Sequence, residues 1–131
     1  MAELSPFGVR ATSGSLREGE GVALPHAWTE AGVLAGPVTN GAQALHLSVA
    51  LCLLNDTYRE AERLAVRVDG VAVTADGAFD DVWTSTGITY DVTVDTPAER
   101  SALDLLLEVV DEVAEIPRVL RAGADVRRAG Q

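Results

Sequence analysis

The sequence contains no lysine, and all ten of its basic residues are arginines. A chain without lysine cannot form a Schiff base through a side-chain amine and cannot supply the lysine of a phosphate-binding P-loop. Acidic residues outnumber basic ones twenty to ten, which gives a formal net charge of −10. Nucleic acid is therefore not expected as a partner, and an anionic membrane surface is disfavoured for the same reason.

Residues that bind metals and form disulfides are also scarce. Cys52 is the only cysteine, so no internal disulfide can form, and only two histidines accompany it. We expect no metal site and no cofactor, because these few residues show no ligand spacing. The apolar run at 44–54 is too short to span a bilayer, and the first ten residues do not resemble a signal peptide. A reducing cytoplasm is the expected location.

The 131 residues, 47% of them hydrophobic, suit one globular domain over 1–131. A helix is predicted from about residue 41 to residue 64, because no glycine or proline interrupts 42–64 and Thr39 and Asn40 are good N-cap residues. The first half of this helix is apolar almost all round, which indicates a central helix buried on most sides. Its second half is amphipathic and more exposed.

Short strands are predicted before and after this helix. Segments 7–15 and 19–28 read as two strands around a polar turn, and segment 29–38 reads as a strand edge or a loop. The valines of segment 64–79 change parity at Gly70, which predicts a bulge or tight turn there. Strict alternation in 87–96 predicts a half-buried strand, with Ile88, Tyr90, Val92 and Val94 on one face.

A second helix is predicted after Thr96, with Thr96 as N-cap, Pro97 in the first turn and Glu99 completing a capping box. Pro117 should break this helix, and a short helical turn should follow and end at Gly123. The last residues, 124–130, are expected to form a closing strand or a tail. Because the strands are grouped, the pattern favours an α+β fold over a doubly wound parallel sheet.

Cys52 lies within the apolar part of the long helix, but helical spacing places Ser48, Asn55, Asp56 and Arg59 on its side. Two readings stay open. A free cysteine is often a small hydrophobic residue of the core. A reactive thiol would need a nearby cation to stabilise its thiolate, and Arg17 and Arg59 are the candidates. His46 points elsewhere and is expected to be a packed or hydrogen-bonded core residue.

The order of these segments resembles that of the OsmC/Ohr family of thiol-dependent hydroperoxide reductases. "ATSGSLREG" resembles the first hairpin with its arginine, and "TNGAQALHLSVALC" resembles the segment that leads to the peroxidatic cysteine. "VRVDG", "ITYDVTVD" and "AEIPRVLRAGADV" resemble the later strands and the final helix. The resemblance covers roughly residues 8–128 and implies an intertwined homodimer, in which an antiparallel sheet wraps around a long central helix.

In the family mechanism a peroxidatic thiolate attacks a hydroperoxide, a second cysteine resolves the product, an arginine lowers the thiol pKa and a glutamate orients that arginine. By position, Cys52 matches the peroxidatic cysteine and Arg17 the arginine. Two roles are missing: Ile116 stands where the resolving cysteine would precede Pro117, and Ala42 or Gln43 stands where the glutamate should lie. The intramolecular disulfide of the family therefore cannot form.

Two functions follow as hypotheses. The chain is either a single-cysteine organic hydroperoxide reductase, which uses Cys52, Arg17 and an external thiol reductant, or a non-redox protein. In the second case a small hydrophobic ligand binds in a pocket at the dimer interface, with Cys52 in its wall. The residues expected to line the pocket are Ser48, Asn55, Asp56 and Ile116.

Overall fold

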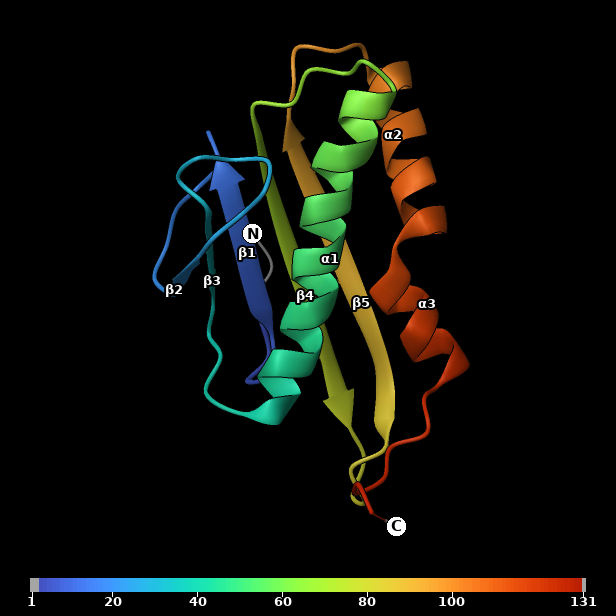
Figure 1. Ribbon diagram of the computed structural model, residues 1–131. Helices are drawn as coiled ribbons and strands as arrows, with labels where there is room; N and C mark the ends of the chain where they lie inside the picture. The colour runs from blue at the N-terminus through green and yellow to red at the C-terminus, as the bar shows by residue number, and fades with distance from the viewer. Residues whose placement is uncertain (1–2, 131) are drawn as a thin grey trace.

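The computed structural model describes residues 3–130, which form a five-stranded antiparallel sheet and three helices (Figure 1). The strands are β1 (Val9–Gly14), β2 (Val22–Leu24), β3 (Val33–Gly36), β4 (Gly70–Phe79) and β5 (Ser85–Asp95). The helices are α1 (Gly41–Arg63), α2 (Arg100–Val113) and α3 (Glu115–Ala122). The strand order is β2-β3-β1-β4-β5, and every neighbouring pair is antiparallel.

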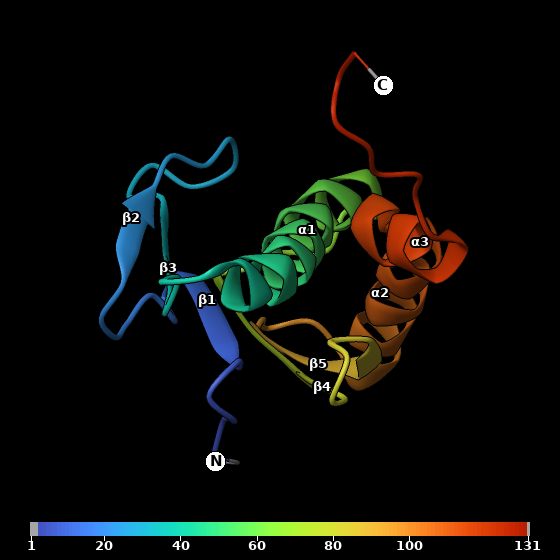
Figure 2. The same cartoon turned by 90° about the horizontal axis from the view of Figure 1, so that it is seen from below.

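The long helix α1 lies in the concave side of the sheet. Seen from below, β2 and β3 lie on one side of α1, β4 and β5 lie beneath it, and α2 and α3 close the other side (Figure 2). The predicted α+β fold with an antiparallel sheet around a long helix is confirmed. No helix in the described part of the chain is both long and apolar enough to cross a membrane.

The core lies between α1 and the middle strands. Val9 and Ala11 of β1 pair with Ala75 and Val73 of β4, and all four side chains are buried. Because side chains alternate across a strand, this register places one row from each strand against α1. The buried helix residues that meet these rows include Leu47, Ala50, Leu53 and Leu54.

The start of α1 is as predicted, and it explains what Gln43 does. Asn40 is the N-cap, and its Oδ1 accepts a hydrogen bond from the Gln43 amide at 2.9 Å. The Gln43 side chain reaches back and accepts from the amide of Thr39, the residue before the N-cap, at 2.7 Å, so the two side chains fasten the start of the helix in both directions. Its Nε2 donates to the carbonyl of Pro6. Gln43 is thus engaged in starting the helix.

Two sequence predictions about the sheet need correction, and a third is decided between its alternatives. The valines before Gly70 are not in a strand: β4 begins at Gly70, and the irregularity in the β4–β5 pairing lies at Ala78/Phe79. Of the closing strand or tail predicted for the last residues, the tail is observed, because residues 123–130 have no strand partner among the described residues. Segment 29–38 contains β3, which lies between β2 and β1 and is not an edge strand.

The start of α2 also differs from the prediction. Its N-cap is Glu99, whose side chain makes no capping bond. The Thr96 hydroxyl donates to the carbonyl of Arg67 and accepts from the Ala98 amide, so it fastens the β5–α2 connection to the α1–β4 loop. A local capping pattern could not predict the hydrogen bond between Thr96 and Arg67, because the two residues are far apart in the sequence. The break before Pro117 is confirmed: Ala114 has an extended backbone between α2 and α3, and Gly123 ends α3.

Candidate functional site

Cys52 lies midway along α1 and faces the start of α3. Its side chain is half-buried. The chain turns sharply at Ala114, so the first turn of α3 comes down beside α1, and the backbone N–H of Ile116 points at the Cys52 sulfur. The sulfur thus lies next to one of the first-turn amides of α3, which have no partner within the helix. Ile116 therefore lies beside Cys52, as expected from the sequence.

Two carboxylates also face the thiol. Cys52 Sγ lies 3.9 Å from Asp56 Oδ2 and 3.6 Å from Glu115 Oε2. Burial raises the pKa of the Cys52 thiol above its ordinary value, and the negative charges of Asp56 and Glu115 raise it further, while the Ile116 amide acts in the opposite direction. The net effect keeps the thiol protonated, because a thiolate would form close to two anions.

Arg59 supplies a cation close to this cluster, but its guanidinium is already paired with carboxylates. Its Nη1 lies 3.2 Å from Asp56 Oδ1 and 3.4 Å from Glu115 Oε1, and its Nε lies 3.2 Å from Glu60 Oε2. The Asp56 carboxylate is buried, which raises its pKa, and Asn55 and Arg59 lower it without reversing the shift. Arg59 thus ties α1 to the first turn of α3 by bridging acidic groups.

Arg17 is not part of this cluster within one chain. It follows β1, and the β1–β2 connection lies across α1 from α3 in both views (Figures 1 and 2). Its Nε is buried and has no hydrogen-bond partner in the described part of the chain. The pairing of Arg17 with Cys52 stays a prediction, and it would require the arginine of a second copy.

The other predicted pocket residues share a side of α1 with Cys52, but their polar groups are engaged. The Ser48 hydroxyl donates to the carbonyl of Leu45 at 2.6 Å. Asn55 Nδ2 donates to Asp56 Oδ1 at 3.3 Å. His46 is fully buried, with Nδ1 2.8 Å from the carbonyl oxygen of Phe7 and its ring stacked on Phe79, which confirms that it is a core histidine.

Cys52, Asp56 and Glu115 offer three metal-ligand atoms within 4.8 Å of one another. Zinc accepts thiolate and carboxylate ligands, so the donor types would suit it. However, Arg59 already pairs with both carboxylates, and a cation would have to displace it. We assign no metal to this cluster.

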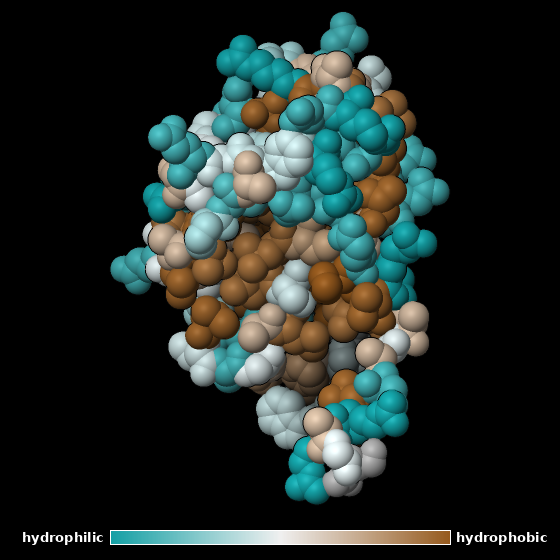
Figure 3. Space-filling model, in the orientation of Figure 1, coloured by the Kyte–Doolittle hydropathy of each residue, from teal (hydrophilic) through white to brown (hydrophobic). Residues whose placement is uncertain are grey.

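A cavity of about 310 Å³ opens between α1, β5 and α3, one to two turns from Cys52 along α1. Brown, apolar residues gather over the lower part of the molecule, around the first half of α1, whereas the far end of α1 is hydrophilic (Figure 3). The lining residues are Leu45 and Val49 of α1, Ser85, Gly87, Ile88 and Tyr90 of β5, and Pro117, Leu120 and Arg121 of α3.

Sequence reasoning missed this cavity, although one signal for it was present. The alternation in β5 placed Ile88 and Tyr90 on one face, and that face lines the cavity. Nothing in the sequence showed that Leu120 and Arg121 would lie opposite them. Tyr90 Oη donates to Asp111 Oδ1 at 2.5 Å. Burial raises the pKa of Tyr90, Asp111 raises it further, and a hydrogen bond from Arg121 opposes both effects.

No protein-family model and no curated protein sequence matches the chain. Among solved structures, it is similar to the crystal structure of an OsmC-like hydroperoxide resistance protein from Jannaschia sp. CCS1, with a TM-score of 0.53. The match covers 93% of this chain and 92% of that chain at 17% sequence identity, so it concerns the fold. The chain therefore has an OsmC-like fold, an α+β arrangement in which a five-stranded antiparallel sheet surrounds one long helix.

Proposed function

We propose that this OsmC-like chain binds a small hydrophobic ligand in the cavity between α1, β5 and α3, and that Cys52 is not a peroxidatic thiol. The observation that carries the proposal is the environment of Cys52. Its sulfur faces Asp56 and Glu115, which favour the thiol over the thiolate. A peroxidatic cysteine needs the opposite, because the thiolate is the nucleophile.

The position beside the sulfur also lacks the second half of a redox pair. Ile116 lies where a resolving thiol would be needed, and its amide points at Cys52 Sγ. An isoleucine side chain cannot form a disulfide, so a sulfenic acid at Cys52 would have no partner within the chain. The Ile116 side chain packs against the core and does not line the cavity, whereas its neighbour Pro117 does.

The cavity has the size and chemistry of a ligand site. Small-molecule pockets are typically about 300–1,000 Å³ and mostly apolar with a few polar groups. This one measures about 310 Å³, and Leu45, Val49, Ile88 and Leu120 supply apolar walls. Ser85 and Gly87, which also line it, are exposed on β5.

The proposal includes a homodimer built on the outer face of α1. This face is apolar or small and remains incompletely buried in one chain, at Ala44, Leu45, Ser48, Leu51 and Cys52. Small side chains permit two helices to approach closely, and a second copy would cover this face as well as the neighbouring α3. Ala44→Arg, at an exposed position, should convert a dimer into a monomer in sedimentation or light-scattering measurements, whereas Glu62→Arg should not. A monomeric unsubstituted chain would refute the dimer.

Ligand binding can be tested by thermal denaturation in the presence of 1-octanol. A ligand that binds only the folded state at tenfold its dissociation constant should stabilise the fold by about 1.4 kcal/mol, or roughly 5 °C for a chain of this size. Leu120→Trp should block the cavity and abolish the shift, while Leu105→Trp, on an exposed part of α2, should retain it. No shift for the unsubstituted protein, or equal shifts for both variants, would refute the proposal.

A second candidate function is a single-cysteine hydroperoxide reductase, favoured by the unpartnered Arg17 Nε and by the Ile116 amide on the sulfur. A partner copy would bring its arginine to Cys52. The thiolate would attack the O–O bond and give a sulfenic acid and an alcohol; one external thiol would then form a mixed disulfide with loss of water, and a second would reduce it. Cys52→Ser should abolish turnover of an organic hydroperoxide if this function operates, and equal rates would exclude it.

A further inference from the structure

The cavity between α1, β5 and α3 has one charged group in its lining, the guanidinium of Arg121. None of the lining residues is acidic. Within residues 3–130, no carboxylate lies within ion-pair distance of this arginine; its side-chain partner is the Tyr90 hydroxyl. An arginine at the edge of an apolar cavity thus forms no ion pair with any carboxylate among residues 3–130.

The Tyr90 hydroxyl lies beside this guanidinium. Its hydroxyl gives its proton to Asp111, so the oxygen is left as an acceptor for Arg121. The guanidinium has five N–H donors in a planar fork, and one bond to a hydroxyl leaves most of them available. Tyr90 thus interacts with both Asp111 and Arg121, and no direct ion pair joins the two charged groups in the described part of the chain.

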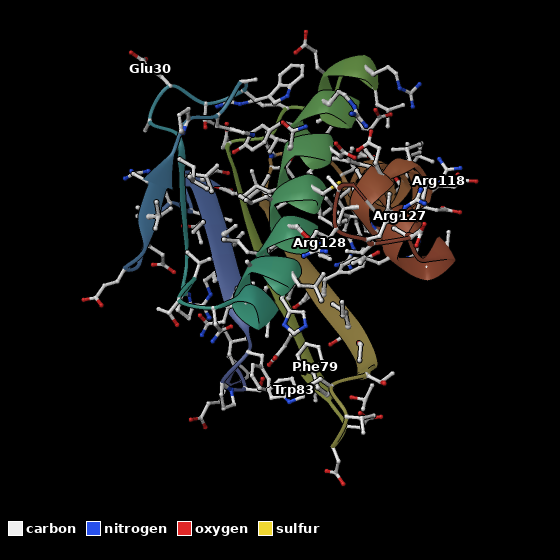
Figure 4. The ribbon with its side chains drawn as sticks, turned by 60° about the horizontal axis from the view of Figure 1, so that its bottom comes forward. Glu30, Phe79, Trp83, Arg118, Arg127 and Arg128 are labelled. Atoms are coloured by element: carbon white, nitrogen blue, oxygen red, sulfur yellow. The ribbon has the colours of Figure 1, made fainter. Side chains whose placement is uncertain are left out.

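The charge around this end of the chain differs from that of the rest of the molecule. Residues 116–131 contain four arginines and one acidic residue, although the whole chain carries a net charge of −10. Three of these arginines, Arg118, Arg127 and Arg128, extend from α3 and the segment after it in Figure 4. Helix α3 supplies one wall of the apolar cavity, and Arg121 is the one of these four arginines that lines it, which favours an anionic ligand there.

We propose that the ligand is an amphipathic carboxylate, with its hydrocarbon body in the cavity and its carboxylate on Arg121. This inference rests on the proposed function and specifies its ligand class. The apolar body contacts Leu45, Val49 and Ile88, and the head group meets the guanidinium at the α3 side. A planar carboxylate matches the planar fork of an arginine through two parallel hydrogen bonds.

The cavity volume limits the length of the ligand. At about 30 Å³ for each water-sized group, 310 Å³ holds roughly ten non-hydrogen atoms. An eight-carbon fatty acid has that size. Octanoate and 1-octanol are therefore a suitable pair of probes, because they share the hydrocarbon body and differ in the charged head group.

The experiment measures the affinities of octanoate and 1-octanol by calorimetry, for the unsubstituted protein, Arg121→Gln and Arg118→Gln. Arg118 is the control, because it lies one turn earlier on α3 and does not line the cavity. Octanoate should bind the unsubstituted protein about tenfold or more tightly than 1-octanol, the size of one charge-assisted contact. Arg121→Gln should weaken octanoate binding about tenfold more than it weakens 1-octanol binding, which removes that advantage, and Arg118→Gln should retain it.

The outcomes separate this inference from the function on which it rests. If 1-octanol binds as tightly as octanoate, or if Arg118→Gln weakens octanoate as much as Arg121→Gln does, the carboxylate assignment is wrong and the hydrophobic site remains. If neither probe binds, the proposed function fails together with the inference.

Discussion

Replacing Ile116 with cysteine would place a second thiol beside Cys52 and test the geometry of the site directly. The Ile116 amide points at the Cys52 sulfur, so residue 116 has its backbone next to the thiol. A disulfide requires Cα atoms about 4.4–6.8 Å apart, and we expect the Ile116→Cys side chain to meet that requirement. Diamide should then oxidise the variant to an intramolecular disulfide that joins α1 to the start of α3.

The expected stabilisation follows from the chain that the disulfide would close. About 65 residues separate the two positions, and the loop-entropy relation gives about 4 kcal/mol at 25 °C for a loop of that length. For a domain of 131 residues, this corresponds to an increase in Tm of roughly 10–15 °C. The reduced variant should be less stable than the unsubstituted protein by about 1–2 kcal/mol, because a half-buried isoleucine loses contacts.

The assay compares the oxidised and reduced forms of the same variant, so the lost isoleucine contacts cancel. Intact mass should fall by two hydrogens on oxidation, and Tm should rise. Leu105→Cys, on the exposed part of α2, is the matched control and should form no intramolecular disulfide. Failure of diamide to cross-link Ile116→Cys would refute the placement of α3 over Cys52. Rapid cross-linking by an organic hydroperoxide in place of diamide would instead favour the reductase.

Three further predictions concern charge and packing. Glu115→Gln should speed alkylation of Cys52 by iodoacetamide at pH 7 about fivefold. The reason is that an anion 3.6 Å from the sulfur, in a water-like dielectric, disfavours the thiolate by about 1 kcal/mol. An unchanged alkylation rate would contradict this prediction. Burial acts to raise the pKa of Asp76, but hydrogen-bond donors from the N-terminal segment and Gly77 outweigh burial, and the net pKa is lowered. The ionised Asp76 should therefore stabilise the fold above about pH 4, and this contribution should be lost as pH falls through the lowered pKa. Asp76→Asn should therefore show a lower Tm at pH 7 and a shallower acid decline, measured by thermal denaturation across pH; parallel curves would argue against it. Gly77→Ala should destabilise the fold by about 1–3 kcal/mol in urea, because its Cβ would lie 2.5 Å from a backbone oxygen of β5, while Gly41→Ala meets open space and should not.

Local features of the site were predictable because helix spacing fixes which residues share a face. Asp56, one helical turn after Cys52, lies 3.9 Å from its sulfur, and the break before Pro117 occurs where the proline requires it. The position of Ile116 beside Cys52 was also expected, although only through the resemblance to a known family. Local capping patterns failed at Thr96, whose hydroxyl found an acceptor in a distant loop.

The alternation of β5 placed Ile88 and Tyr90 on one face, but it could not show which helix that face would meet. Glu115, sixty-three residues from Cys52 in the chain, reaches its sulfur because the extended Ala114 redirects the backbone. The same redirection brings Arg121 to the cavity. The charge that surrounds a thiol decides its reactivity, and that charge comes from residues far away in the sequence.

The sequence by itself determined the α+β class, the long helix, the half-buried strand and the presence of a single thiol, because these depend on periodicity, on proline and glycine, and on residue counts. Only the tertiary structure decided that two carboxylates face this thiol and that an apolar cavity with one arginine lies beside it. Electrostatic and packing interactions depend on distances in space, and the folded chain sets those distances through contacts between segments that the sequence keeps far apart.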